Sequence, residues 1–259
     1  MAFNIWKIGL HIQQHEVLAV AIVREASGWY LQRWWRIPLT PQVIVDGHIR
    51  EPEQLVAALL SWSRELPRRH HIHLSFPANR TLQKKSPRPT MTLREPAQPA
   101  WLSGSMAREL DMAPDALHFD YSEDTLSPAF NVTAAQSKEI SALLTLIQTL
   151  KVQVTAITPD ASALQRFIPF LPEHHQCLVW RDDAQWLWAT RSAWGRKSTG
   201  DISCIEELAT TLSLPTTAIA KCSPGGFDPL SAVSVRQPPI PTQSHHFAIA
   251  LGLAMGGVY

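Results

Sequence analysis

The chain lacks long apolar segments. Its longest apolar run covers residues 247–255, far short of the roughly 20 residues that a helix needs to cross a bilayer. The first residues also lack the basic and apolar regions of a secretory signal peptide. We therefore expect a cytoplasmic protein that is peripheral at the inner membrane only through a partner.

Cysteine is scarce, and neither sign of charge dominates. The three cysteines, Cys177, Cys204 and Cys222, lie far apart and form no CxxC pair, which argues against a disulfide framework and fits a reducing compartment. The 23 basic and 22 acidic side chains leave a formal net charge of +1. No global basic field therefore favours nucleic acid as a partner.

Tryptophan and proline are abundant instead. The 259 residues include 10 Trp and 20 Pro, and 45% are hydrophobic, which is typical of a globular chain with one or two domains. We expect most Trp side chains to fill the core. The alternative is that some of them form a surface for a partner, because Trp is enriched at interface hot spots.

Two stretches of the chain show the same order of predicted elements. In the first, alternating and continuous apolar patterns predict strands, and an i, i+3, i+4, i+7 pattern predicts a helix. The predicted elements are strands at 6–12, 17–23 and 29–37, a helix at 52–65 and a strand at 72–76. A polar turn at 13–16 makes the first two strands a hairpin.

The second stretch begins at Cys177. Its predicted elements are strands at 177–180 and 185–190 around a turn at 181–184, a helix at 205–212 after a capping-box pattern at 203–206, a strand at 217–222 and a closing helix at 246–255. The repeated order predicts two α/β lobes that face a cleft.

The segment between the two stretches has a different texture. Residues 77–120 mix basic side chains with proline and predict an irregular, exposed insertion with its own small fold. Within and after it we expect a helix at 103–112, a strand at 116–121, a helix that follows a capping-box pattern at 133–136, a strand at 152–156 and a short helix at 161–170.

Several segments resemble, in chain order, those of the PilM family of type IV pilus assembly proteins. They are residues 8–12 (Ile-Gly-Leu-His-Ile), 45–49 (Val-Asp-Gly-His-Ile), 75–78 (Ser-Phe-Pro-Ala), 112–121, 133–167 and 247–255 (Phe-Ala-Ile-Ala-Leu-Gly-Leu-Ala-Met). The resemblance spans nearly the whole chain. Within that family, the chain is most similar to a divergent enterobacterial branch. The resemblance implies an actin-like α/β fold with two RNase H-like lobes.

The resemblance also implies a division of the chain. Residues 1–76 and 157–175 would form the first lobe, 77–156 a small α+β subdomain inserted in it, and 176–259 a reduced second lobe. In actin-like ATPases each hairpin turn cradles phosphates, which requires Gly and Ser for close backbone approach and an Asp for Mg²⁺.

Both turns depart from that pattern. At the first, His11 replaces Asp, Gln13 replaces Gly, and Gln14 replaces Ser. At the second, Trp180 replaces Asp and is followed by Asp182 and Asp183, whose charges would repel a triphosphate.

At the position of the family's adenosine loop only Gly225 and Gly226 remain, and a Gly pair after a strand is also an ordinary turn signal. The resemblance therefore implies no catalytic residue, no bound metal and no cofactor, with ATP and Mg²⁺ unexpected. The alternative left open is a nucleotide-binding actin-like ATPase of the same machinery.

Other candidate sites are weaker. The His residues at 70, 71, 73, 174, 175, 245 and 246 lack the spacing of a zinc motif, and the basic stretch 80–94 lacks the aromatic platform of a nucleic-acid site. The segment Asp160-Ala-Ser lacks the nucleophile-elbow motif of a serine hydrolase. Glu109, Asp111, Asp115 and Asp120 are expected on a solvated face.

The favoured function is a non-enzymatic scaffold of a type IV pilus or competence-type DNA-uptake machinery. In the family the partner is a PilN-type bitopic inner-membrane protein, whose cytoplasmic N-terminal peptide docks on the actin-like component. Here its groove would be bounded by parts of residues 8–75 and 77–155, a known mode of peptide docking. Self-association is left open, and neither direct nucleic-acid binding nor membrane insertion is expected.

Overall fold

The computed structural model describes residues 5–89, 94, 97–124, 127–182 and 184–256. The chain forms two compact units, one built from its residues up to 79 and again from 147 onward, the other from residues 80–146. The lobe boundaries expected near residues 76, 157 and 176 stay predictions. Within the described ranges, every helix is too short or too polar to cross a membrane.

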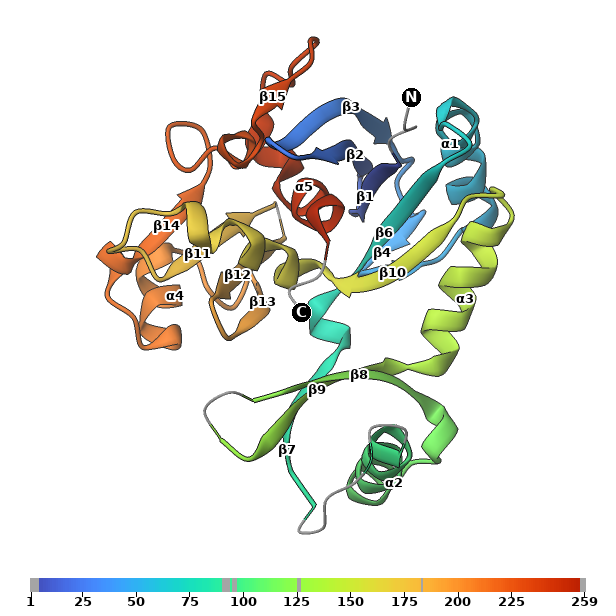
Figure 1. Ribbon diagram of the computed structural model, residues 1–259, viewed down its shortest axis with the longest axis vertical. Helices are drawn as coiled ribbons and strands as arrows, with labels where there is room; N and C mark the ends of the chain where they lie inside the picture. The colour runs from blue at the N-terminus through green and yellow to red at the C-terminus, as the bar shows by residue number, and fades with distance from the viewer. Residues whose placement is uncertain (1–4, 90–93, 95–96, 125–126, 183, 257–259) are drawn as a thin grey trace. The chain divides into compact units, whose positions relative to one another are not determined.

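The first unit contains a six-stranded sheet in the order β10-β6-β1-β2-β3-β15 (Figure 1). Its strands are β1 (Trp6–Ile12), β2 (Glu16–Glu25), β3 (Gly28–Pro38), β6 (His70–Phe76), β10 (Val154–Pro159) and β15 (Val235–Arg236). β1, β2 and β3 pair antiparallel, whereas β6 runs parallel to both β1 and β10. The carboxyl ends of β1, β6 and β10 therefore lie at one end of the sheet.

Each face of this sheet carries a helix. Trp62 of α1 (Pro52–Glu65) packs edge-to-face on Trp35 of β3, and α5 (Ala248–Met255) contacts β1, β2 and β6. Trp35, which faces α1, pairs with Ala19, whereas Gly9, which faces α5, pairs with the next residue, Val20. Because successive residues of a strand point to opposite faces, α1 and α5 cover opposite sides of the sheet.

The same unit contains a second, four-stranded sheet in the order β13-β12-β11-β14. Its elements are β11 (Cys177–Arg181), β12 (Gln185–Thr190), β13 (Trp194–Ser198), α4 (Ile205–Leu212) and β14 (Ile219–Cys222). Three antiparallel strands are followed by a helix and a strand parallel to the first of them, as in the first sheet. The predicted repetition of a hairpin, helix and strand is thereby confirmed.

Helix α5 is a buried connection between the first sheet and the 3₁₀ helix η4 (Asp160–Phe170). A Cβ on Gly9 would lie 1.8 Å from the Ala250 carbonyl oxygen, and a Cβ on Gly252 would lie 2.3 Å from the Ala163 carbonyl oxygen. Glycine at both positions therefore lets backbone pack directly on backbone.

The described residues of the second unit contain a three-stranded sheet in the order β7-β9-β8 and the α-helices α2 and α3. Its elements are β7 (Leu82–Pro87), α2 (Gln98–Leu110), β8 (Leu117–Glu123), β9 (Ala129–Gln136) and α3 (Ser137–Gln148), which runs past its end. Leu102 and Met106 of α2 pack against Phe130, Val132 and Ala134 of β9. The prediction of an irregular insertion was therefore wrong for β7, whose apolar residues are too few to signal a strand.

Short elements complete the fold. They are β4 (Ile44–Val45), β5 (His48–Ile49) and the 3₁₀ helices η1 (Ala78–Arg80), η3 (Pro114–Ala116), η5 (Thr216–Ala218), η6 (Pro229–Ala232) and η7 (Ser244–Phe247). The predicted closing helix is thus a 3₁₀ turn, η7, followed by α5. The predicted short helix at 161–170 is likewise 3₁₀.

Both predicted capping boxes were wrong. Residues 133–136 belong to β9, where they pair with β8 and Ala134 joins the core of the second unit, and α3 begins only at Ser137. The N-cap of α4 is Cys204 without a side-chain cap, and Glu207 instead accepts hydrogen bonds from the Ser203 N–H at 2.8 Å and hydroxyl at 3.0 Å.

Candidate functional site

The ends of the first strands of the two sheets meet in the interior of the first unit. His11, near the end of β1, packs edge-to-face on Trp180 of β11, with ring centroids 5.6 Å apart. Each residue is only 2% exposed. The indole N–H of Trp180 donates to the His245 carbonyl oxygen at 2.9 Å. Two aromatic rings therefore occupy the positions where the resemblance places aspartates.

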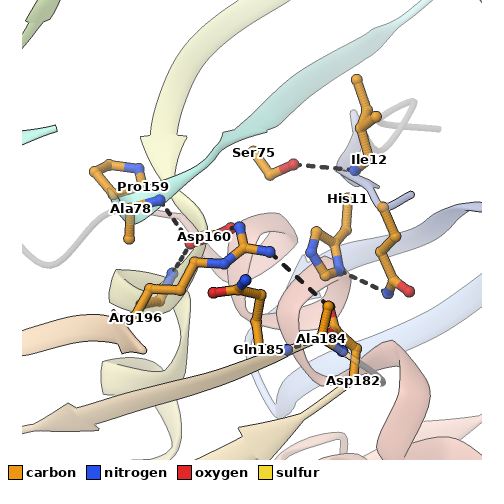
Figure 2. Close-up of polar contacts among 12 residues, drawn as sticks. His11, Ile12, Ser75, Ala78, Pro159, Asp160, Asp182, Ala184, Gln185 and Arg196 are labelled. Carbon is orange, nitrogen blue, oxygen red and sulfur yellow. Dashed lines mark hydrogen bonds and ion pairs between the residues drawn. The ribbon is translucent and has the colours of Figure 1, made fainter. Parts of the chain in front are cut away.

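The first hairpin turn is closed by its own side chains (Figure 2). The Gln13 side-chain amide donates to Nδ1 of His11 at 3.1 Å, and the Gln13 backbone N–H donates to the Glu16 carbonyl at 2.9 Å. The Ile12 N–H donates to the Ser75 hydroxyl oxygen at 3.0 Å. Gln14 is exposed at the tip. The donors at the base of this turn are thus used within the protein.

The environment of His11 keeps its ring neutral. Burial, together with the positive charge of Arg196, lowers the pKa of His11 from 6.5 to about 3. In the unfolded chain the ring would bind a proton below its ordinary pKa, whereas in the folded chain it does not. Folding is therefore opposed by acid in the window from pH 6.5 down to about 3.

A pH prediction follows for His11→Phe. The native protein should lose roughly 1.4 kcal/mol of unfolding free energy per pH unit within that window from this residue. The variant keeps an aromatic ring on Trp180 and should lack this loss, as measured by urea unfolding at pH 7 and at pH 5. His15→Phe, on the exposed part of the turn, is the control. An unchanged pH slope in His11→Phe would contradict the assignment.

The second hairpin turn uses its aspartate as a local acceptor. Oδ1 of Asp182 accepts hydrogen bonds from the N–H groups of Ala184 at 2.8 Å and Gln185 at 2.6 Å. Asp183, also predicted to repel phosphate, lies outside the described residues. Oδ2 of Asp182 lies 3.9 Å from a guanidinium nitrogen of Arg196. The turn is thus stabilised by one of the two carboxylates that were predicted to repel a triphosphate.

Asp160, at the start of η4, is the most buried carboxylate of this region. It accepts hydrogen bonds from the N–H of Ala78 at 3.0 Å and of Ala161 at 2.7 Å, and from Nη1 of Arg196 at 2.6 Å (Figure 2). Burial raises the pKa of Asp160, and the Arg196 guanidinium and the backbone donors oppose that rise. Nε of Arg196 is buried without a partner.

Arg196 therefore bridges Asp160, at the end of the first sheet, to Asp182 in the second hairpin. The sequence does not indicate this arginine, because it lies on β13, a strand whose pattern Trp-Gly-Arg-Lys-Ser carries no apolar alternation. A metal ion between the two carboxylates would have to displace the guanidinium. The expectation that no Mg²⁺ binds stays a prediction.

Gly225 and Gly226 form a tight turn after β14. Gly225 has a φ of +75°, and a Cβ on Gly226 would lie 2.3 Å from the Lys221 carbonyl oxygen. The turn is closed by hydrogen bonds from Gly226 N–H to Ser223 O and from Phe227 N–H to Lys221 O. A cavity of about 390 Å³ adjoins it, lined by residues 223–228 and 242–245. Turn geometry alone accounts for both glycines.

The other predicted candidates are distributed over the fold. Among the residues that the structure describes, no group of three or more His, Cys, Asp or Glu side chains is placed to hold a metal ion. The basic stretch is largely ion-paired within the second unit. Its pairs are Arg80–Glu139, Lys84–Glu109, Lys85–Asp124 at 2.6 Å and Arg88–Glu123 at 3.0 Å.

The chain resembles known proteins over its full length. It is 64% identical to the DNA utilization protein HofM of Escherichia coli strain K12, over 100% of both chains. In a solved PilM-PilN type IV pilus biogenesis complex, one chain matches with a TM-score of 0.72 and 14% identity, over 99% of this chain and 100% of that one. No protein-family model matches the chain.

A second solved structure has the same fold. The cytoplasmic domain of EpsL, an inner membrane component of the type II secretion system of Vibrio cholerae, matches with a TM-score of 0.58 and 12% identity, over 97% of this chain and 95% of that one. These likenesses confirm the predicted actin-like α/β fold and the predicted resemblance to the PilM family.

Proposed function

The chain belongs to the HofM family of PilM-like proteins, and on that premise we propose that it is a non-enzymatic cytoplasmic scaffold of a type IV pilus or DNA-uptake machinery. Two relatives support the machinery: HofM of Escherichia coli is a DNA utilization protein, and the PilM-PilN complex is a type IV pilus biogenesis complex. A scaffold needs the rigid actin-like frame but not its ATPase chemistry.

The single observation that carries the non-enzymatic part is the packing between the two hairpins. His11 and Trp180 fill that region with two buried rings, and Asp160, Arg196 and Asp182 join its two sides by charge. Phosphates need open backbone donors and a nearby cation that is free to bind them. Here the donors and the cation are already bound to groups of the protein.

The proposed partner is a PilN-type inner-membrane protein, which would bring the scaffold to the cytoplasmic face of the membrane. The matched PilM-PilN complex is itself an assembly of this kind. We propose that the partner's cytoplasmic N-terminal peptide docks in extended form, so that backbone hydrogen bonds supply affinity and side-chain pockets supply specificity.

Titration calorimetry tests the proposal directly. The purified protein should release heat with a peptide that carries the cytoplasmic N-terminus of a PilN-type protein from the same organism, and should give none with Mg-ATP at about millimolar concentration, where even a Kd near 1 mM is detectable. The same peptide with a scrambled sequence is the control.

Two results would overturn parts of this proposal. Saturable heat with Mg-ATP, lost on chelation of Mg²⁺, would favour the alternative of a nucleotide-binding ATPase. No heat with either the native or the scrambled peptide would sink the docking mode. Direct nucleic-acid binding by residues 80–94 is disfavoured, because their carboxylate partners would have to be released first.

A further inference from the structure

The six-stranded sheet has a second end, opposite the one that carries His11 and Asp160. β1, β6 and β10 all begin there, since the Trp6 N–H donates to the Arg69 carbonyl at 3.2 Å and the Ile72 N–H donates to the Gln153 carbonyl at 2.9 Å. β2 runs antiparallel and ends there, because Ile22 already pairs with Lys7. Figure 1 shows α1 finishing beside the start of β6.

Basic side chains gather at this end, which we call the basic end. Its members are Lys7, Arg24, Arg64, Arg68, Arg69 and Lys151. All except the half-buried Lys7 are exposed. Of the acidic residues nearby, Glu65 already binds Arg33 at 2.7 Å and accepts a hydrogen bond from Trp35. Glu25 also ends β2 here, so basic side chains outnumber acidic ones at one end of a chain whose net charge is only +1.

A buried histidine fixes the two loops that carry much of this charge. His70 is 8% exposed, and its Nδ1 lies 2.6 Å from the Pro67 carbonyl oxygen while its Nε2 accepts the Gln153 N–H at 3.2 Å. A neutral ring with its proton on Nδ1 satisfies both contacts. The ring therefore holds Arg68 and Arg69 next to the loop of Lys151.

Aromatic and apolar side chains lie among these cations. The Trp29 ring has Nζ of Lys7 at 5.3 Å and the Arg24 guanidinium at 4.8 Å from its centroid, and Ile5 is 45% exposed. Cations mixed with Trp and exposed aliphatic side chains are typical of surfaces that sit at lipid headgroups. Because cations cover the Trp29 ring, it is poorly placed to stack on bases, which disfavours single-stranded nucleic acid.

We propose that the basic end binds anionic lipid headgroups at a membrane surface. The contact is electrostatic and peripheral, since the apolar area exposed there is small. It goes beyond the proposed scaffold function, because it would be made by this chain itself and needs no protein partner. Each basic side chain next to an anionic bilayer adds several-fold to the partition coefficient, and the attraction fades within a Debye length.

Flotation of the full-length protein with vesicles tests this inference. Vesicles with about one-third phosphatidylglycerol in phosphatidylcholine should bind the protein, and pure phosphatidylcholine vesicles should not. The double variant Arg68→Gln with Lys151→Gln should lower the partition coefficient roughly 30-fold. Raising the salt from about 0.1 M to about 1 M should release the native protein.

The control is a variant of equal charge. Arg50→Gln with Arg191→Gln removes two exposed cations that lie away from the basic end and should retain most of the binding, with circular dichroism confirming that both variants fold. Equal loss in the two variants, or equal binding to neutral vesicles, would overturn the proposal. Binding of double-stranded DNA with the same dependence on Arg68 and Lys151, without vesicle binding, would reassign the surface to nucleic acid.

Discussion

Gly9→Ala is expected to destabilise the first unit by about 4 kcal/mol or more, enough to prevent folding at physiological temperature. The added Cβ would lie 1.8 Å from the Ala250 carbonyl oxygen and 2.7 Å from the Ala254 backbone nitrogen. Both atoms belong to the backbone of α5, which cannot rotate away as a side chain would. Strand β1 and helix α5 would have to separate and expose the apolar surface between them.

Thermal and urea unfolding measure this effect, with Gly200→Ala as the control. Gly200 belongs to the same unit, its Cβ would meet only the Ser198 hydroxyl at 3.4 Å, and its φ is not left-handed. That control should stay within about 0.5 kcal/mol of the native protein. If Gly9→Ala unfolds at the same urea concentration as the native protein, α5 cannot lie as close to β1 as the structure places it.

Asp160→Ala should cost about 3–5 kcal/mol of unfolding free energy. The substitution leaves the Arg196 guanidinium, whose side chain is only 15% exposed, without its nearest counter-charge. It also removes the acceptor of the Ala78 and Ala161 N–H groups. An uncompensated buried charge and two unmet donors each carry a desolvation penalty.

A second substitution separates the charge from the backbone contribution. Asp160→Ala combined with Arg196→Met removes the buried cation as well and should recover about 1–3 kcal/mol of the loss. Asp201→Ala, the same change at an exposed aspartate, should be nearly neutral. A strictly additive double variant would show that the ion pair does not couple the two sheets.

Local pattern predicted most of the elements in the first unit. Period-2 alternation marked β1 and the apolar run marked β2, because each strand has one or both faces buried. The same signal failed at β7 and β13, where few apolar residues alternate. Local signals also misplaced the start of α3, since residues 133–136 fit a capping box by sequence but end strand β9, where Ala134 joins the core of the second unit.

The candidate site was predicted by what its turns lack, and its occupants were not predicted. The sequence alone showed that His11, Gln13 and Trp180 replace the residues of a phosphate-binding turn, because such a turn has strict backbone requirements. The bond between Gln13 and His11, and the packing of His11 on Trp180, join residues that no local pattern connects. Arg196 was not predicted either, because its strand, β13, lacks the apolar alternation that marks a strand.

The sequence by itself determined most strands and helices of the first unit, the repeated plan and the loss of phosphate-turn residues, because these depend on neighbouring positions along the chain. Only the tertiary structure decided that Arg196 joins Asp160 to Asp182 and that Gly9 lets α5 pack closely on β1. It also decided that the basic residues from β1, β2, α1 and two loops share one end of a sheet. Each of these depends on which distant strands pair, and pairing is set by the burial of the whole core.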